Sequence, residues 1–505
     1  MNKYFKVVFV LLISFLASCA AQGSLSSGDV SFSNNTSLEE SYDSSSVSSD
    51  VGSLSSNDTS SSSGYRYENK EMDKFFNPAT CIYISLNFTS ESIHNMSDYG
   101  GSNTDTTRHD IYHPADISVS IDGVVQNYQK VGVRLKGNTS RRYIMDGNWF
   151  NGNFVNFTVK FNETFTDEPY TSLMDKNLKT RLFLSDLEKI YLKWNKNADS
   201  TFTKELYANY LLQEEGIMAQ RVNICRLTLK MDGKTLYGFS DINYHVYEAI
   251  DNDFLKRRMP EENAKGNLYK GMGCTLNEEA VDQVGVEDNA NNIHYPCDLK
   301  TNKKNADHTL FKQCVVAINT IGSVDTVKPL INQYVDVNYL LKYSAAMWVI
   351  GNPDDFRYNA GNTYFYFDSV TNKLYFIPFD NDSCFGILKD MHYDLSNSGP
   401  LDLRDFYGYT PDSNYCKSHL LWRTILPMDE QNYPVNKEWQ NTYLKLCLEY
   451  ATKYLNTDRF QKFTDSYALA PSQLISFGGV DNDSFITYAS NKLKTIQSFM
   501  KDYNM

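Results

Sequence analysis

The segment 351–386 constrains the fold of this 505-residue chain most strongly, because two aromatic runs in it are separated by a turn-forming sequence. Residues 364–367 are Tyr-Phe-Tyr-Phe, residues 369–373 form a polar stretch, and residues 374–379 are again rich in aromatic side chains. Short runs of this composition on either side of a polar turn are typical of antiparallel strands. The segment therefore predicts a β-hairpin.

Acidic and amide side chains lie at both ends of this predicted hairpin. Asp354, Asp355 and Asn362 come before the first strand, and Asp380 and Asp382 follow the second. A hairpin returns its second strand to the start of the first, so we expect these side chains to form a group of hard oxygen ligands suited to Mg²⁺ and nucleotide phosphates. Asp and Asn are also common in ordinary turns, because they cap and turn the backbone readily. Composition alone favours that structural interpretation.

Several segments resemble the CotH family, the spore coat protein H type of atypical protein kinase. The strongest likeness is in NPDDFRYNAGNTYFYFD and KLYFIPFDNDSCFG, at 352–368 and 373–386, where the family has an Asp, an Asn-Tyr aromatic strand, a turn and a Pro-aromatic-Asp-x-Asp run ending in Phe-Gly. Residues 116–142 are similar to its early strand, its Asp-Gly turn and its Arg-x-Arg-Gly-Asn-Ser-Ser element, from which Lys136 and Thr139 depart. The resemblance extends over roughly 83–500.

The resemblance implies an α+β fold with the two lobes of an atypical protein kinase. We expect a β-rich N-terminal lobe over about 67–270 and a more helical C-terminal lobe over about 328–505. Residues 261–327 are the least similar to the family and are interpreted as a variable insertion. The apolar spacing after Asp390, for example in 439–455, itself indicates helices.

The activity that the resemblance implies is Mg-ATP-dependent phosphorylation of Ser or Thr on exported or surface proteins. Phosphoryl transfer requires metal ligands, a cation at the phosphates and a carboxylate that orients the attacking hydroxyl. The family pattern gives the last role to Asp355, with Asp354 as the second choice. Asn362 and Asp380 then bind Mg²⁺ or Mn²⁺, and Asp382 is an auxiliary ligand.

Two lysines are candidates for the cation at the ATP phosphates, and the sequence does not decide between them. Lys193 lies in a strand-like segment just before the predicted helix 201–215, in which Glu205 could form a kinase-type ion pair with it. Lys160 lies in the alternating strand Asn-Phe-Thr-Val-Lys-Phe. Either lysine could equally be a solvated strand residue.

A further ATP-binding element is expected around Arg134, Gly137 and Asn138. The turn after this strand can present backbone N–H groups to phosphate, as Gly-rich turns do. Farther along, Glu248 is interpreted as a surface charge and His245 as a packed or exposed histidine without a catalytic role.

The N-terminal residues are typical of an export signal. A basic start precedes an apolar run at 7–16 that is too short to span a bilayer, and the Leu-Ala-Ser-Cys that ends at Cys19 resembles a bacterial lipobox. Residues 1–19 are therefore expected to be a signal peptide with Cys19 as a lipid anchor, the alternative being ordinary cleavage near Ala20. The Ser-rich segment 20–66 is expected to be a disordered tether on an exported protein.

Charge and cysteine usage narrow the function further. A formal net charge of −13 argues against nonspecific nucleic-acid binding. No Cys or His spacing suggests zinc, and export permits disulfides. Cys274 and Cys297 bracket an Asn-rich stretch, and we expect them to form a bridge that restrains it.

The expected location outside the cell suggests an alternative function, because ATP is scarce there. A catalytically inactive CotH-like surface module would bind polysaccharide or a protein partner instead. The abundance of Tyr, 36 residues, suits an exposed binding protein. Asp355, Asn362 and Asp380 favour the kinase, because a binding module has no chemical need for all three.

Overall fold

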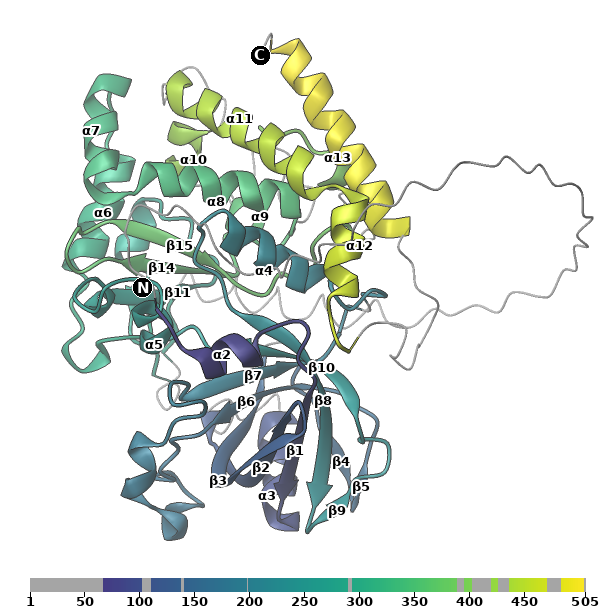
Figure 1. Cartoon of the computed structure of the whole chain (residues 1–505). Coiled ribbons are helices and arrows are strands. Elements are labelled where there is room, and N and C mark those ends of the chain that lie inside the picture. The colour runs from purple at the N-terminus through teal and green to yellow at the C-terminus, as the bar shows by residue number, and fades with distance from the viewer. Residues whose placement is uncertain are drawn as a thin grey trace, which may run out of the picture. The chain divides into compact units, whose positions relative to one another are not determined.

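The computed structural model describes residues 67–101, 110–137, 140–197, 199–288, 293–387, 395–401, 419–425, 436–469 and 483–503. These residues belong to one compact unit, 58–505, that contains an eight-stranded sheet, a five-stranded sheet and many helices (Figure 1). This mixed content confirms the predicted α+β class. The predicted signal peptide and tether lie outside the described residues.

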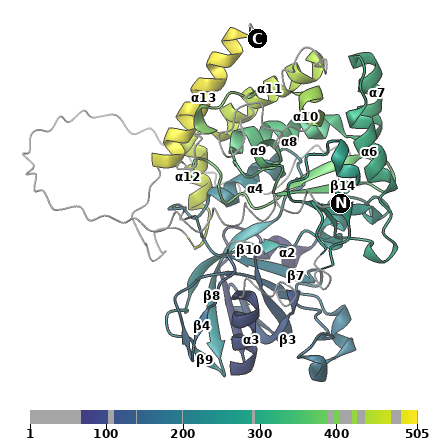
Figure 2. The same cartoon turned by 180° about the vertical axis from the view of Figure 1, so that it is seen from behind.

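The eight-stranded sheet uses the first part of the described chain. Its strands follow the order β1-β2-β3-β6-β7-β10-β8-β9, and β1 also pairs in parallel with β8. Apolar side chains of this sheet pack against α3 (Ser90–Gly101), which Figure 2 shows beside the strands. The strands are β1 (Ile82–Phe88), β2 (His113–Ile121), β3 (Val124–Lys136), β6 (Asn156–Lys160), β7 (Lys189–Lys193), β8 (Val222–Met231), β9 (Lys234–Thr235) and β10 (Ile242–Glu248), with a separate ribbon of β4 (Met145–Asp146) and β5 (Trp149–Phe150).

The five-stranded sheet contains the predicted hairpin. Strands β14 (Thr363–Phe367) and β15 (Leu374–Pro378) pair antiparallel, so the hairpin is confirmed. All five residues of β14 are buried, as expected for an aromatic run that packs on both faces. The other strands are β11 (Asn267–Gly271), β12 (Val284–Gly285) and β13 (Cys297–Leu299), which lie in the segment interpreted as an insertion. Because β11 pairs directly with β14, that segment is an integral part of the sheet.

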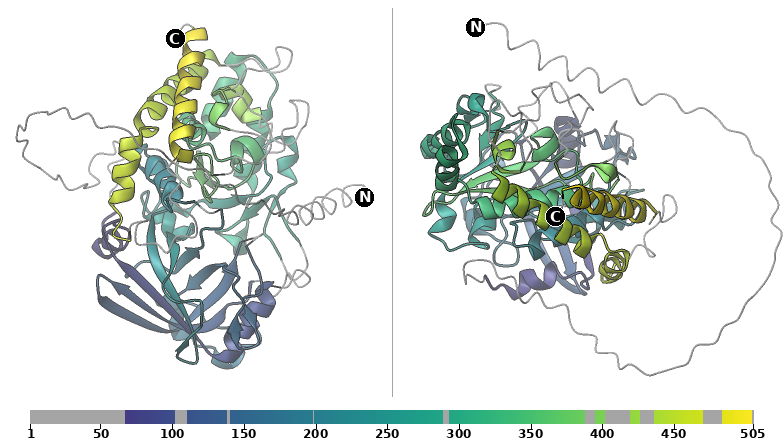
Figure 3. Two further views of the ribbon diagram at one scale, coloured as in Figure 1. Left: turned by 90° about the vertical axis from the view of Figure 1, so that its right-hand side faces the viewer. Right: turned by 90° about the horizontal axis from the view of Figure 1, so that it is seen from above.

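Most of the helices pack with the five-stranded sheet in a second hydrophobic core, separate from that of the eight-stranded sheet. Residues 345–350 of α8 (Val337–Ile350) are fully buried there, and Gly351 ends this helix with a positive φ of 61°. A side chain at Gly351 would collide with the Tyr488 hydroxyl, so the turn that leads into the acidic segment requires glycine. Figure 3 shows α13 beside α11 and α12. The helices are α2 (Lys70–Phe75), α4 (Lys204–Glu214), α5 (Asn252–Lys256), α6 (Thr309–Asn319), α7 (Val324–Tyr334), α9 (Phe356–Asn359), α10 (His419–Thr424), α11 (Lys437–Tyr454), α12 (Thr457–Asp465) and α13 (Asp483–Asp502).

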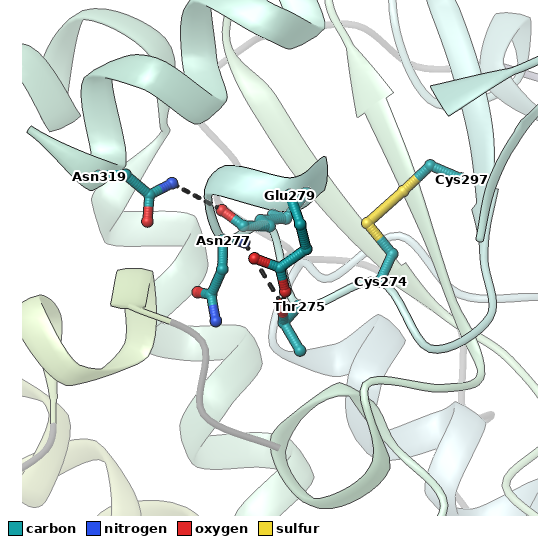
Figure 4. The surroundings of a disulfide bond; sticks show 7 residues. Cys274, Thr275, Asn277, Glu279, Cys297 and Asn319 are labelled. Carbon is teal, nitrogen blue, oxygen red and sulfur yellow. Dashed lines mark hydrogen bonds between the residues drawn. A yellow bond between two sulfur atoms is a disulfide. The ribbon is translucent and has the colours of Figure 1, made fainter. Parts of the chain in front are cut away.

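The predicted disulfide between Cys274 and Cys297 is present (Figure 4). It joins the loop after β11 to the start of β13, and both cysteines are fully buried. Beside it, the Asn319 side chain of α6 donates a hydrogen bond of 2.9 Å to the Leu276 carbonyl. The bridge therefore belongs to a buried part of the second core. None of the helices in the described ranges combines the length and the apolar character needed to cross a membrane.

Candidate functional site

A buried ion pair joins the end of β7 to the first turn of α4. Lys193 Nζ lies 2.8 Å and 3.1 Å from the two carboxylate oxygens of Glu205. The same ammonium group contacts Asp380 and lies 3.2 Å from Asp382 Oδ2. Burial opposes the charge on Lys193, but the carboxylates of Asp380, Asp382 and Glu205 outweigh it and raise the Lys193 pKa well above its usual value. Lys193 is therefore a fixed cation at neutral pH.

Asp380 and Asp382 follow β15, where the backbone leaves the hairpin. Asp380 has a left-handed φ of 60°, and its carbonyl accepts a hydrogen bond of 3.2 Å from the Asn352 side chain. Burial alone would raise the pKa of Asp380, but nearby lysines, Lys193 first among them, lower it to about 2. Burial raises the pKa of Asp382 to about 6, and the charge of Asp380 adds to this effect against the attraction of Lys193. Asp380 is thus the more strongly ionised of the two.

Asp354 lies with this group at the other end of the hairpin. Its carboxylate accepts hydrogen bonds from the side chains of Asn359 and Asn362, the latter at 2.9 Å. Burial raises the Asp354 pKa, and the charges of Asp380 and Asp382 raise it further. The structure therefore brings Asp354, Asn362, Asp380 and Asp382 together, as the hairpin predicts.

Asp355, the first choice for the hydroxyl-orienting residue, faces a different environment. It caps the N-terminus of α9, where its carboxylate accepts hydrogen bonds from the backbone N–H groups of Arg357 (2.8 Å) and Tyr358 (3.2 Å). The side chain is fully buried, and burial raises its pKa to about 7. Its position is that of a helix cap.

The remaining predicted residues lie apart from the acidic group. Lys160 Nζ pairs with Glu163 at 2.9 Å, and none of its described contacts involves Asp380 or Asp382. Arg134 pairs with Asp110. The structure thus favours Lys193 over Lys160 as the cation of the site.

The turn proposed to contact phosphate is described only in part. Gly137 has a positive φ of 106°, and a Cβ there would collide with the Ser140 hydroxyl, so the turn requires glycine. Asn138 lies outside the described residues.

His245 and Tyr247 on β10 pack beside the ion pair, and the Tyr247 ring centroid is 6.0 Å from Lys193 Nζ. The His245 Nε2 atom is 2.8 Å from the Phe202 carbonyl oxygen, and Nδ1 is 3.8 Å from a Glu205 carboxylate oxygen. Burial lowers the His245 pKa to about 4, so this histidine is neutral near pH 7. The sequence interpretation as a packed histidine agrees with this placement.

Two lysines near Asp380 were missed in the sequence. Lys136 and Lys270 both act electrostatically on Asp380. The available signals were the Lys136 departure from the family element and the lysine in the sequence Gly-Asn-Leu-Tyr-Lys-Gly at 266–271, which falls within the segment interpreted as an insertion.

The donor set suits a metal that is shared with a nucleotide. Within the described ranges, no three His, Cys, Asp or Glu side chains form a closed metal-binding group. Mg²⁺ in nucleotide sites needs only one or two carboxylates, because phosphates and water complete its shell. Asn362 directs its amide nitrogen to Asp354, so its carbonyl oxygen is the atom that could act as a ligand beside Asp380 and Asp382.

A protein-family model covers the segment that contains most of these residues. The chain matches the family model described as CotH kinase protein over residues 147–493. No curated protein matches it. The match to the family model covers the ion pair of Lys193 and Glu205, the hairpin and the acidic residues at both ends of the hairpin. Because this match spans most of the chain, the protein belongs to the CotH family.

Proposed function

We propose that this protein is a Mg-ATP-dependent Ser/Thr kinase that acts on exported or surface proteins. The observation that carries the proposal is the buried pair of Lys193 and Glu205 beside Asp380. Protein kinases hold a strand lysine against a helix glutamate in this way, next to an aspartate that binds the metal. We also propose a two-lobed kinase-like architecture, with the eight-stranded sheet and the hairpin-bearing core on either side of the site.

Each residue at the site has a distinct role in this proposal. Asp380, Asp382 and the Asn362 carbonyl oxygen would hold Mg²⁺, which neutralises charge on the phosphate oxygens when bound. Lys193, fixed by Glu205, orients the phosphates. Asp354 accepts the hydrogen bond of the attacking hydroxyl, because it is the member of the tandem pair that lies with Asp380 and Asp382.

Export through the signal sequence and anchoring at Cys19 belong to the same proposal. The support for them is the basic start, the short apolar run and the Leu-Ala-Ser-Cys sequence. The substrate would then be a protein that follows the same route.

A second candidate function is a surface module that binds polysaccharide or protein without catalysis. Trp149 and Tyr237 favour it, because their side chains are 71% and 88% exposed. Phe150, next to Trp149 on β5, packs on Phe239 with ring centroids 5.0 Å apart, so the two exposed rings belong to neighbouring segments. Exposed aromatic rings are common at binding surfaces.

The deciding experiment incubates the purified protein with γ-labelled ATP and Mg²⁺ or Mn²⁺, with and without an added Ser-rich protein. Asp380→Asn is the matched variant, because it keeps the size of the side chain and removes the negative charge. We expect label on protein with the wild-type chain and a loss of about hundredfold or more in the variant. Absence of label in the wild type, together with no nucleotide binding, would instead favour the non-catalytic module.

A further inference from the structure

Lys136 has an ammonium group that forms no salt bridge with any described carboxylate. It is the last residue of β3 in the eight-stranded sheet, and its Nζ lies 4.5 Å from the ring centroid of Tyr191 on β7. No described carboxylate lies within 4.0 Å of this nitrogen. An aromatic face attracts an ammonium group but leaves its positive charge unneutralised.

Lys270, in the five-stranded sheet, also contacts an aromatic ring and forms no salt bridge with a described carboxylate. It lies on β11, and its Nζ is 5.2 Å from the ring centroid of Phe379, the residue before Asp380. It also has no described carboxylate within 4.0 Å. The acid opposite it in the sheet, Asp298, pairs with Lys300 instead.

The rings that these lysines contact place both of them beside the acidic group, from different sheets. Tyr191 comes two residues before Lys193 on β7, and Phe379 comes directly before Asp380. Together with Lys193 they are the charges that lower the pKa of Asp380 against the effect of burial. Burial lowers the pKa of Lys136, and burial followed by repulsion from Lys136 lowers that of Lys270 to about 8. Two desolvated like charges are costly to keep close together, and a bound anion would offset that cost.

We propose that Lys136 and Lys270 clamp the polyphosphate chain of the nucleotide from opposite sheets, so that the site selects nucleoside di- and triphosphates over monophosphates. The inference rests on the proposed function, since it concerns the same nucleotide. Lys193 is already held by Glu205 and the acidic residues, so it cannot neutralise a polyphosphate alone. Ammonium groups suit this task, because each offers three donors to phosphate oxygens.

The test measures binding of Mg-ATP, AMP and inorganic tripolyphosphate to the full chain by calorimetry. The variants are Lys136→Met and Lys270→Met, with Lys136→Arg and Lys270→Arg to restore the charge. Lys265→Met is the matched control, because its side chain is 65% exposed and lies just before β11. Thermal unfolding of each variant checks that the fold is intact.

We expect each Met variant to weaken binding of ATP and tripolyphosphate by about tenfold or more, the loss typical of one charged hydrogen bond. AMP affinity should stay unchanged, the Arg variants should recover most of the binding, and the Lys265→Met control should resemble wild type. Unchanged ATP and tripolyphosphate affinity in both Met variants would overturn the clamp, as would an equal loss for AMP.

The labelling experiment separates this inference from the proposed function. Lysine-dependent binding of ATP and tripolyphosphate without any phosphoryl transfer would keep the clamp and remove the kinase activity. Phosphoryl transfer by the wild type with lysine-independent ATP affinity would keep the kinase activity and remove the clamp.

Discussion

The adjacent residues Asp354 and Asp355 have different hydrogen-bond partners and therefore different roles in the structure. Asp355 points into the backbone at the start of α9, where a carboxylate is a good helix cap. Asp354 accepts hydrogen bonds from Asn359 and Asn362 and interacts with Asp380 and Asp382. A shift of one residue in the chain thus separates a structural acid from an acid of the candidate site.

This difference predicts that the same Asp-to-Asn substitution affects phosphoryl transfer at Asp354 but not at Asp355. Asp354→Asn should lower phosphoryl transfer by about 10²- to 10⁴-fold, because it removes the carboxylate that accepts the hydroxyl proton in the proposed mechanism. Its ATP affinity should change little, since the interaction matters in the transition state. Asp355→Asn should retain transfer, because Asn also caps helices well.

Single-turnover kinetics and ATP titrations of both variants check the prediction. If Asp355→Asn lost phosphoryl transfer and Asp354→Asn retained it, the hydroxyl-orienting role would belong to Asp355.

At the scale of elements, a buried charge network joins β10 to α5. Glu248 is 0% exposed and pairs with Arg257 Nε and Arg258 Nη2, each at 2.6 Å. Its carboxylate also accepts a hydrogen bond from the Arg221 backbone N–H at 3.1 Å. The sequence interpretation of Glu248 as a surface charge is therefore wrong, because the paired arginines satisfy a carboxylate that apolar burial alone would exclude.

Glu248→Gln should destabilise the fold by about 3–5 kcal/mol, because it leaves buried guanidinium groups without their counter-charge. Burial alone would raise the Glu248 pKa, but Arg258 and Arg257 lower it to about 2. A depressed folded-state pKa gives stability that is fully present above the ordinary value of 4.5 and is lost as the pH falls toward 2.

Urea unfolding of wild type and Glu248→Gln between pH 2 and pH 7 measures both effects. The difference between the two proteins should shrink as the pH falls through this range. Glu261→Gln is the control, since its side chain is 76% exposed and its loss should cost little. An equal stability of all three proteins at pH 7 would contradict the prediction.

At the scale of the whole molecule, the acidic group and its cations are carried by two parts of the fold, each of which has its own hydrophobic core. The eight-stranded sheet has its own core with α3, and the helices pack with the five-stranded sheet in another. Lys193 on β7 of the first sheet contacts Asp380 after β15 of the second. A ligand held by these residues therefore contacts both parts of the fold.

Mg-ATP should accordingly raise the thermal unfolding midpoint of the whole chain. Ligand at about 100 times its Kd adds roughly 2.7 kcal/mol of stability, provided that it binds only the folded state. ATP with a chelator should give a much smaller shift, because the acidic residues then repel the phosphates. Calorimetric scans with ATP, with Mg²⁺ and with both together check this expectation, and an equal shift for ATP with and without Mg²⁺ would contradict it.

The sequence by itself determined the features that depend on local pattern. Aromatic runs around a polar turn predict the hairpin of β14 and β15, apolar spacing predicts helices such as α11, and the spacing of Cys274 and Cys297 around an Asn-rich stretch predicts their bridge. The family resemblance pointed to the acidic residues as candidates, because its motif is contiguous in the chain. Each of these signals lies within a few tens of residues.

Only the tertiary structure decided which side chains meet. Lys193 and Asp380 are separated by 187 residues, so no local pattern could favour Lys193 over Lys160. Lys136 and Lys270 are brought to the same carboxylate by strand register, and a shift of one residue would turn each lysine to the opposite face of its sheet. The local sequence formed the elements, whereas packing between them selected the residues of the site.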